Sequence, residues 1–146
     1  MTNMTKSKIE KFEDLIVWQK SMSLAEEIYR VTKQGEFAKD WGLREQVRRA
    51  AVSVPSNIAE GYERQTTQEY VRYITIAKGS VGELRTQISL AGRIGHLTPV
   101  EASALVESCQ EISRMLGGLK RRLKEQKKGK RIKDKGESEP HACFNL

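Results

Sequence analysis

The sequence predicts an all-α protein: an antiparallel up-down-up-down four-helix bundle with a kinked second helix and a disordered C-terminal tail. Three observations lead to this fold class. Four segments repeat apolar residues at three- and four-residue steps, two Thr-x-x-Glu boxes mark helix starts, and the chain has only three prolines. A chain of 146 residues can bury one core. We divide it into a flexible N-terminus (1–11), the bundle (12–126) and a disordered basic tail (127–146).

The first two helices are expected over residues 14–33 and 42–62, and Gly35 indicates a connection over residues 34–40. The apolar side chains of each helix fall on one face. The first face consists of Leu15, Trp18, Met22, Ala25, Ile28 and Tyr29, and the second of Leu43, Val47, Ala50, Val54, Ile58 and Gly61. Pro55 lies inside the second pattern. Because proline lacks an N–H and crowds the preceding turn, we expect a kink there, within one helix whose apolar phase continues.

The third and fourth helices each begin with a capping box, Thr66 with Glu69 and Thr98 with Glu101. In such a box the threonine hydroxyl accepts from the glutamate N–H, and the carboxylate accepts from the threonine N–H. The third helix is expected to end near Gly95, and the short link to Thr98 makes the last two helices antiparallel neighbours. Their apolar faces are Tyr70, Tyr73, Ala77, Val81, Leu84, Ile88 and Ala91, and then Ala102, Leu105, Cys109, Ile112, Leu116, Leu119 and Leu123.

These faces predict a core and, beyond it, a surface for self-association. The core is led by Trp18, Ile28, Val47, Val54, Ile58, Leu84, Ile88, Leu105, Ile112 and Leu116. The apolar residues beyond a narrow core are Ile74, Ile76, Leu90 and Val106. Exposed apolar patches commonly mark interfaces, so we expect an oligomer. Gly79 and Gly82 each cost a helix about 1 kcal/mol relative to alanine, which indicates close packing there, either inside the bundle or between subunits.

The basic residues concentrate near the C-terminus. Residues 120–135 hold ten Lys or Arg against Glu125 and Asp134, a balance of +8 in a chain whose net charge is +7. Such a segment is either a solubilising terminus or a site that binds polyphosphate through counterion release. The candidate nucleic-acid contacts are Lys120, Arg121, Arg122, Lys124, Lys127, Lys128, Lys130 and Arg131. Second candidates are Arg44, Arg48 and Arg49, of which at least one is expected to pair with Glu60 or Glu83.

The sequence offers no pattern for an enzyme, a cofactor or a metal site. His96 has no nucleophile placed beside it, and no glycine-rich phosphate loop follows a strand. The chain has two histidines and two cysteines without a CxxC pair, and Cys109 falls on an apolar stripe as a small core residue. No apolar run approaches the ~20 residues that span a bilayer, so we expect a cytoplasmic protein without a membrane partner.

Several short motifs together resemble one family. They are Phe12–Leu15, Val17–Lys20, Gln46–Ala51, Asn57–Gly61, and Gly79-Ser80 with Glu83-Leu84. This pattern resembles the four-helix-bundle proteins encoded in intervening sequences of bacterial 23S rRNA genes, which are related to the accessory variability determinant of diversity-generating retroelements. The resemblance implies a ring-shaped homopentamer. For the retroelement relatives it also implies binding to nucleic acid and to a reverse transcriptase.

The sequence therefore predicts a non-enzymatic, homo-oligomeric accessory protein that binds RNA or DNA. Such a protein would assist a reverse transcriptase of a diversity-generating retroelement or act on rRNA. The alternative is a protein–protein interaction scaffold whose charges are only structural.

Overall fold

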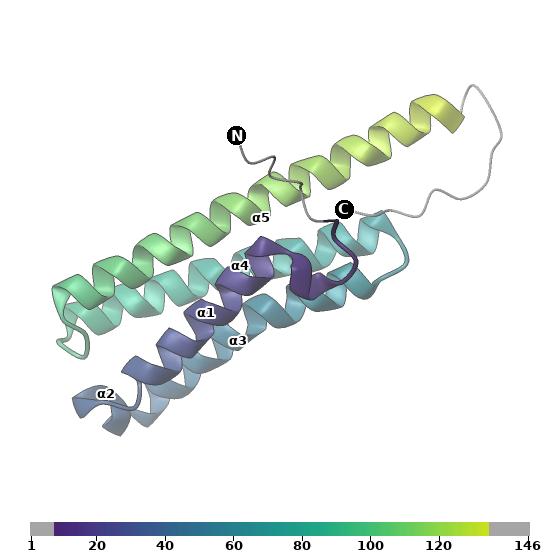
Figure 1. Cartoon of the computed structure of the whole chain (residues 1–146). Helices are drawn as coiled ribbons and strands as arrows, with labels where there is room; N and C mark the ends of the chain where they lie inside the picture. Colours follow the sequence, from purple (N-terminus) through teal and green to yellow (C-terminus); the bar gives the residue numbers. More distant parts are fainter. Residues whose placement is uncertain (1–7, 135–146) are drawn as a thin grey trace, which may run out of the picture.

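The computed structural model describes residues 8–134, with side chains described as far as Lys128. Four long helices pack antiparallel, as the sequence predicts (Figure 1). The elements are η1 (Phe12–Asp14), α1 (Ile16–Val31), α2 (Gly35–Lys39), α3 (Trp41–Glu63), α4 (Thr67–Arg93) and α5 (Pro99–Asp134). α3 packs on α1 and α4, and α5 packs on α4 and, less extensively, on α1. The helices thus occupy the corners of a square in the cyclic order α1, α3, α4, α5.

The core face of α1 overlaps the predicted one, with Leu15, Ala25 and Ile28 buried as expected, but it is shifted around the helix. Its buried apolar residues are Val17, Leu24, Ala25, Ile28 and Val31. Trp18 is only half-buried, and Met22 and Tyr29 are 37% and 39% exposed. The predicted stripe was wrong in phase because α1 carries apolar residues on two adjacent faces, and only one of them faces the core.

The segment between α1 and α3 contains a short helix that the sequence analysis treated as a plain connection. Gly35 opens it with a φ of 55°, and Phe37, 1% exposed, anchors it. Asp40 then caps α3 by accepting a hydrogen bond from the Leu43 N–H at 3.2 Å. Its second carboxylate oxygen lies 2.9 Å from His96 Nε2, so this corner is tied to the connection between α4 and α5.

α3 passes through Pro55 as one continuous helix, as expected. Near its end, Gly61 permits close approach to α4, because a Cβ there would lie 2.8 Å from the Cβ of Tyr73. Thr66 caps α4 by accepting from the Glu69 N–H at 3.2 Å. The returning bond differs from the prediction: Glu69 accepts from the Thr66 hydroxyl rather than from its N–H.

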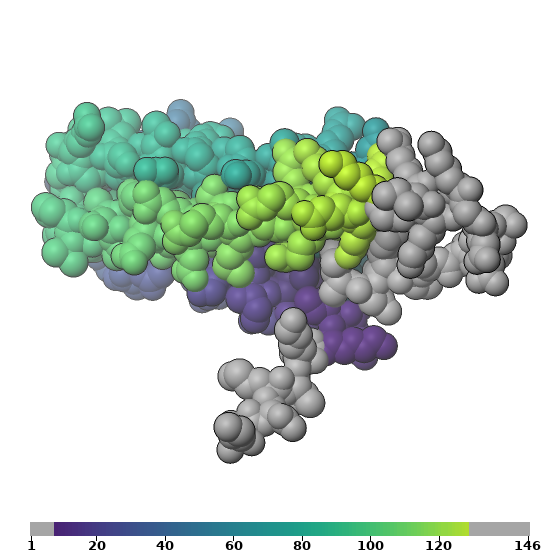
Figure 2. All heavy atoms as spheres, turned by 90° about the horizontal axis from the view of Figure 1, so that it is seen from above, coloured from purple at the N-terminus to yellow at the C-terminus, as the bar shows by residue number. Residues whose placement is uncertain are grey.

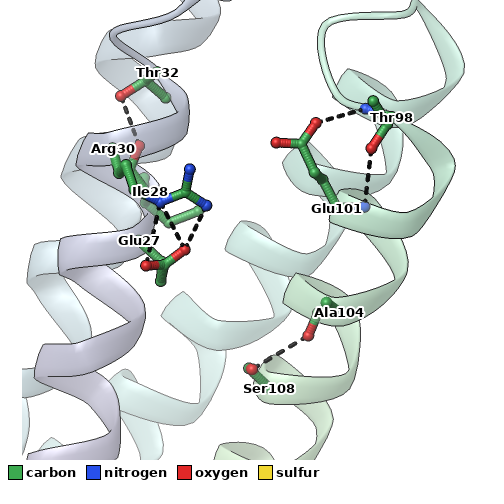
Figure 3. A network of polar contacts seen from close by, with 8 residues as sticks. All are labelled: Glu27, Ile28, Arg30, Thr32, Thr98, Glu101, Ala104 and Ser108. Carbon is green, nitrogen blue, oxygen red and sulfur yellow. Dashed lines mark hydrogen bonds and ion pairs between the residues drawn. The ribbon is translucent and has the colours of Figure 1, made fainter.

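The turn between α4 and α5 has the predicted chemistry. Gly95 adopts a φ of 84°, in the left-handed region. The Thr98–Glu101 box is complete: Thr98 N–H donates to the carboxylate at 3.0 Å, and Glu101 N–H donates to the hydroxyl at 3.2 Å (Figure 3). α5 does not end at Gln126 as predicted but continues to Asp134. The remaining part of the expected disordered tail, residues 135–146, lies outside the described residues.

The predicted core is buried apart from Trp18, and the surplus apolar residues divide into two groups. Ile74 is fully buried, which corrects its prediction as a surface residue, and Val106 is half-buried. Ile76 and Leu90 are 42% and 48% exposed, as expected for residues beyond the core. Within residues 8–134, no helix is both long and apolar enough to cross a membrane.

Candidate nucleic-acid interface

The predicted basic residues lie on one rigid element, the C-terminal part of α5. Leu119 and Leu123 are 4% and 2% exposed and fix this part of the helix to the bundle. Lys120 is half-buried between them, and the cations exposed around the helix are Arg121, Arg122, Lys124, Lys127 and Lys128. Lys130 and Arg131 belong to the same helix, but their side chains lie outside the described residues. The end of α5 projects beyond the connection between α3 and α4 (Figure 1).

A row of cations on α4 extends this basic segment, and the sequence analysis missed it. Lys78 and Arg85 are seven residues apart and therefore share a helix face, on which Gly92 follows. This face is turned towards α5: a Cβ on Gly117 would lie 3.2 Å from Lys78 Nζ, and one on Gly92 would lie 2.9 Å from Ala102 Cβ. α4 and α5 lie side by side on this face of the molecule (Figure 2).

We call this surface the basic face. Its members are Lys78, Arg85 and Arg93 of α4 and Arg114, Lys120, Arg121 and Lys124 of α5. All are exposed except half-buried Lys120. Lys120, Arg121 and Lys124 follow Gly117 by three, four and seven residues, so they continue the side of α5 that Lys78 approaches.

Two carboxylates of these helices are directed away from the basic face and two share it. Glu111 of α5 pairs with Lys20 of α1 at 2.7 Å. Glu107 lies seven residues before Arg114 and Glu125 lies four residues after Arg121, so both share the helix face of these arginines. On α4, Glu83 lies one turn after Ser80, whose hydroxyl is 2.9 Å from Ser53 of α3. The basic face still carries a net positive charge, because its seven cations outnumber Glu107 and Glu125.

Small side chains make the α4 side of the basic face shallow and open. A Cβ on Gly79 or Gly82 would meet no other atom within 4 Å, so neither glycine serves close packing inside the bundle. That interpretation of the two glycines was wrong. Gly82, Arg85, Thr86, Ser89, Leu90 and Arg93 line a depression of about 480 Å³. Two arginines at an open depression suit contact with a phosphate backbone.

The second set of candidates, on α3, is mostly engaged inside the protein. Arg44 donates to the Ala38 carbonyl at 2.8 Å and lies 3.8 Å from the centre of the Trp41 ring. Arg48 donates to Thr32 Oγ1 at 2.9 Å and lies over the Tyr29 ring. Of the three arginines predicted here, only Arg49 is exposed, and Arg44 and Arg48 are half-buried.

The pairing predicted for these arginines was wrong. Glu60 pairs with Arg64 at 2.5 Å, and Glu83 accepts a hydrogen bond from Gln87 at 3.2 Å. α3 and α5 lie at diagonal corners of the bundle, so the structure does not bring the two predicted sets of cations together.

The remaining groups that could carry chemistry are the Cys109 thiol and side chains that could bind a metal ion. Burial raises the pKa of the Cys109 thiol to about 12, so this side chain is a neutral core residue at physiological pH. Within the described part of the chain, no group of three or more His, Cys, Asp and Glu side chains is arranged to hold a metal ion.

Comparison with known proteins agrees with the fold. A family model described as 23S rRNA-intervening sequence protein matches residues 13–118. A solved structure from Bacteroides thetaiotaomicron VPI-5482, described as a protein with unknown function from the S23 ribosomal protein family, superposes with a TM-score of 0.67. It is 21% identical, and the alignment covers 71% of this chain and 97% of that one. A search of curated proteins gave no match. The family match ends before Lys120, so the basic end of α5 lies beyond it, whereas Lys78, Arg85, Arg93 and Arg114 lie within it.

Proposed function

The chain belongs to the 23S rRNA-intervening sequence protein family, and from this premise we propose that it is a non-enzymatic, self-assembling protein that binds nucleic acid. The observation that carries the proposal is the basic face, where seven cations of α4 and α5 share one surface and outnumber the carboxylates Glu107 and Glu125. Cations that neutralise phosphates release condensed counterions, and this supplies affinity without requiring a particular base sequence.

The proposed assembly is a homopentamer, and the proposed partners are RNA or DNA. The number five comes from the family resemblance. In a ring, the basic face would repeat once per subunit, and individually weak contacts would add through multivalency. A role on rRNA or beside a reverse transcriptase is the finer proposal that the resemblance implies. A reverse-transcriptase gene next to this one, or an rRNA gene around it, would distinguish the two.

The second candidate function is a protein–protein scaffold. Arg44 and Arg48 favour it, because their guanidinium groups are bound within the protein and stacked on aromatic rings. If all the cations were as structural as these two, nucleic acid would bind no better to this chain than to any protein of similar net charge.

The test compares two variants of the full chain, each lacking four positive charges. In the first, Lys120, Arg121, Arg122 and Lys124 are replaced by glutamine. In the matched control, the exposed lysines Lys8, Lys11, Lys33 and Lys39 on other parts of the molecule are replaced in the same way. A truncation after Leu119 is avoided because it would remove the buried Leu123.

Binding of fluorescent single-stranded RNA and duplex DNA is measured by anisotropy between 50 and 200 mM salt. Each lost phosphate contact should reduce the slope of log K against log salt by about 0.7–0.9. We expect the first variant to lose affinity and slope, and the control to keep both. Equal affinity and slope in the two variants would leave the scaffold as the better function.

A further inference from the structure

Two consecutive glycines leave a bare patch on α5, next to its basic end. Gly117 and Gly118 are half-buried and lie well inside the helix, where glycine is among the least favourable residues. Within 4 Å, a Cβ on either glycine would meet only the ends of cationic side chains. The packing of the bundle therefore does not require these glycines. Glycine is typical of places where a ligand approaches the backbone closely.

Cations from two helices converge on this bare patch. A Cβ on Gly117 would lie 3.2 Å from Lys78 Nζ of α4, and one on Gly118 would lie 3.6 Å from Arg122 Nη1 and 3.9 Å from Arg121 Nη2. The two arginines follow Gly118 by three and four residues. Because long side chains in a helix lean towards its N-terminus, both arginines reach back over the patch. We call these five residues the diglycine site.

The three cations of the diglycine site are not neutralised by neighbouring carboxylates. Among residues 8–128, Lys78, Arg121 and Arg122 form no ion pair. Glu125 is the carboxylate closest to the two arginines along α5, and it is exposed and outnumbered three to one. Like charges held close together on a helix repel one another. An anion placed between these cations would relieve that repulsion.

A phosphate group is the anion that matches these donors. A guanidinium is a planar fork that can donate to two oxygens of one phosphate, and a lysine adds a compact positive charge. A bare helix below the donors lets the phosphate sit closer than an ordinary side chain would allow. Among the described residues of α5, the only exposed large apolar side chain is Val100, at the opposite end. The site therefore suits a polynucleotide phosphate better than a membrane surface, which also takes up apolar side chains.

We propose that the diglycine site anchors one phosphate of the bound polynucleotide. The phosphate lies over Gly117 and Gly118 and accepts hydrogen bonds from Lys78, Arg121 and Arg122. The inference rests on nucleic-acid binding at the basic face in the proposed function, and it adds the point at which the strand is fixed. Because the lysine belongs to α4 and the arginines to α5, the anchor is complete only when the two helices are packed together.

The experiment fills the diglycine site and leaves every charge of the full chain in place. Gly117→Ala with Gly118→Ala adds two methyl groups, and Gly117→Leu with Gly118→Leu fills more of the same space. Alanine and leucine are both good helix formers. The matched controls carry the same replacements at Gly42 and Gly79, two exposed helical glycines at which a Cβ would meet no cation.

Circular dichroism and light scattering check that each variant folds and keeps the wild-type mass. The alanine pair remains the decisive variant if the leucine pair fails either check. Binding of single-stranded RNA and duplex DNA is then measured by anisotropy over the same salt range as in the test of the proposed function.

We expect the leucine pair at the diglycine site to bind about tenfold more weakly than wild type, because a hydrogen bond to a charged group is worth about one such factor. The slope of log K against log salt should fall by about 0.7–0.9, the contribution of one phosphate. The alanine pair should lose part of this affinity, and both controls should bind as wild type does. Unchanged affinity and slope at the filled site would overturn the proposal.

Two comparisons separate this inference from the proposed function. If the filled variants bind as wild type does while the variant without the charges of Lys120, Arg121, Arg122 and Lys124 loses affinity, only the inference fails. If that charge variant also keeps its affinity, the proposed function fails as well.

Calorimetric titration with inorganic phosphate distinguishes a free anion from a strand. A filled variant that loses binding of inorganic phosphate but keeps its affinity for RNA and DNA would reveal a site for a free anion, which would overturn the proposal. Loss of RNA and DNA affinity at the filled site, with both controls unaffected, is the result that supports it.

Discussion

An open apolar hollow between α1 and α3, which we call the α1–α3 groove, and the basic face lie on opposite sides of one bundle. The groove is lined mainly by apolar residues: Phe12, Trp18, Met22, Tyr29, Val52 and Pro55. The groove exposes aromatic and aliphatic surface beside carboxylates, whereas the basic face exposes small residues between cations. Burial of the groove by a partner would stabilise the complex through the hydrophobic effect, which acts only between surfaces in contact. The basic face acts through a longer-ranged and salt-dependent potential. The two surfaces therefore suit partners of different chemistry, an apolar one for the groove and a polyanion for the basic face.

The largest expected effect distinguishes the two apolar faces of α1. Ile28 is 1% exposed, and Ile28→Ala should lower the free energy of unfolding by about 2–5 kcal/mol through lost burial and a cavity. Met22 lies on the groove side, and Met22→Ala should cost less than about 1 kcal/mol in the unassembled protein. Urea unfolding at a protein concentration where light scattering gives a monomer mass measures both. Equal losses would mean that the groove is part of the folded core and not a surface.

The same helix shows where prediction from the sequence stops. Periodicity located α1, α3, α4 and α5, and the capping residues located two helix starts, because these signals depend on neighbours three and four residues away. Periodicity could not decide which of two adjacent apolar faces of α1 enters the core, because that depends on where α3 lies. Beyond Gln126 a lysine-rich composition suggested disorder, yet lysine, arginine and glutamine are good helix formers and the helix continues to Asp134.

The candidate site was predictable in part for a related reason. The cations of residues 120–131 are contiguous in the sequence and therefore visible as a charge run. Lys78 and Arg85 join them only because α4 packs beside α5, and no count along the chain shows this. Their seven-residue spacing on one helix face was the available signal.

The second prediction tests whether the α4 side of the basic face takes part in binding. Replacing Lys78, Arg85 and Arg93 with glutamine should reduce the slope of log K against log salt by about 2 to 3, since each phosphate contact contributes about 0.7–0.9. Anisotropy titrations with single-stranded RNA and duplex DNA measure the slope. Replacing Lys8, Lys33 and Lys39 provides the control. An unchanged slope would confine binding to the end of α5.

The third prediction concerns the contact that joins the two sides of the molecule. Asp40 caps α3 on the groove side and meets His96, which precedes α5, at 2.9 Å. The hydrogen bond with His96, and then the one from the Leu43 N–H, hold the pKa of Asp40 below its usual value. A carboxyl whose pKa is lowered on folding stabilises the protein above its unfolded pKa of about 3.9, and this contribution is lost as the pH falls through the lower folded value.

Asp40→Ala should therefore be less stable than wild type at pH 6, and the gap should narrow as the pH falls from 5 to 3. Urea midpoints measured across this range test the sign. Glu36→Gln is the control, because Glu36 makes only an exposed ion pair with Lys39 at 3.4 Å. A gap that stays constant with pH would show that Asp40 contributes through packing alone.

The smallest expected effect separates the two surfaces by charge alone. Arg49 and Arg114 are both exposed, but Arg49 lies on α3, one turn before Val52, and Arg114 lies on the basic face. Exposed ion pairs contribute about 0.2–1 kcal/mol, so Arg49→Glu should change self-association no more than a few-fold. Arg114→Glu should leave association unchanged and weaken RNA binding instead. Sedimentation equilibrium measures the first effect, and anisotropy above the assembly concentration measures the second, so that lost multivalency is not mistaken for a lost contact. If both variants changed both measurements equally, the two sides of the bundle would form one continuous functional surface.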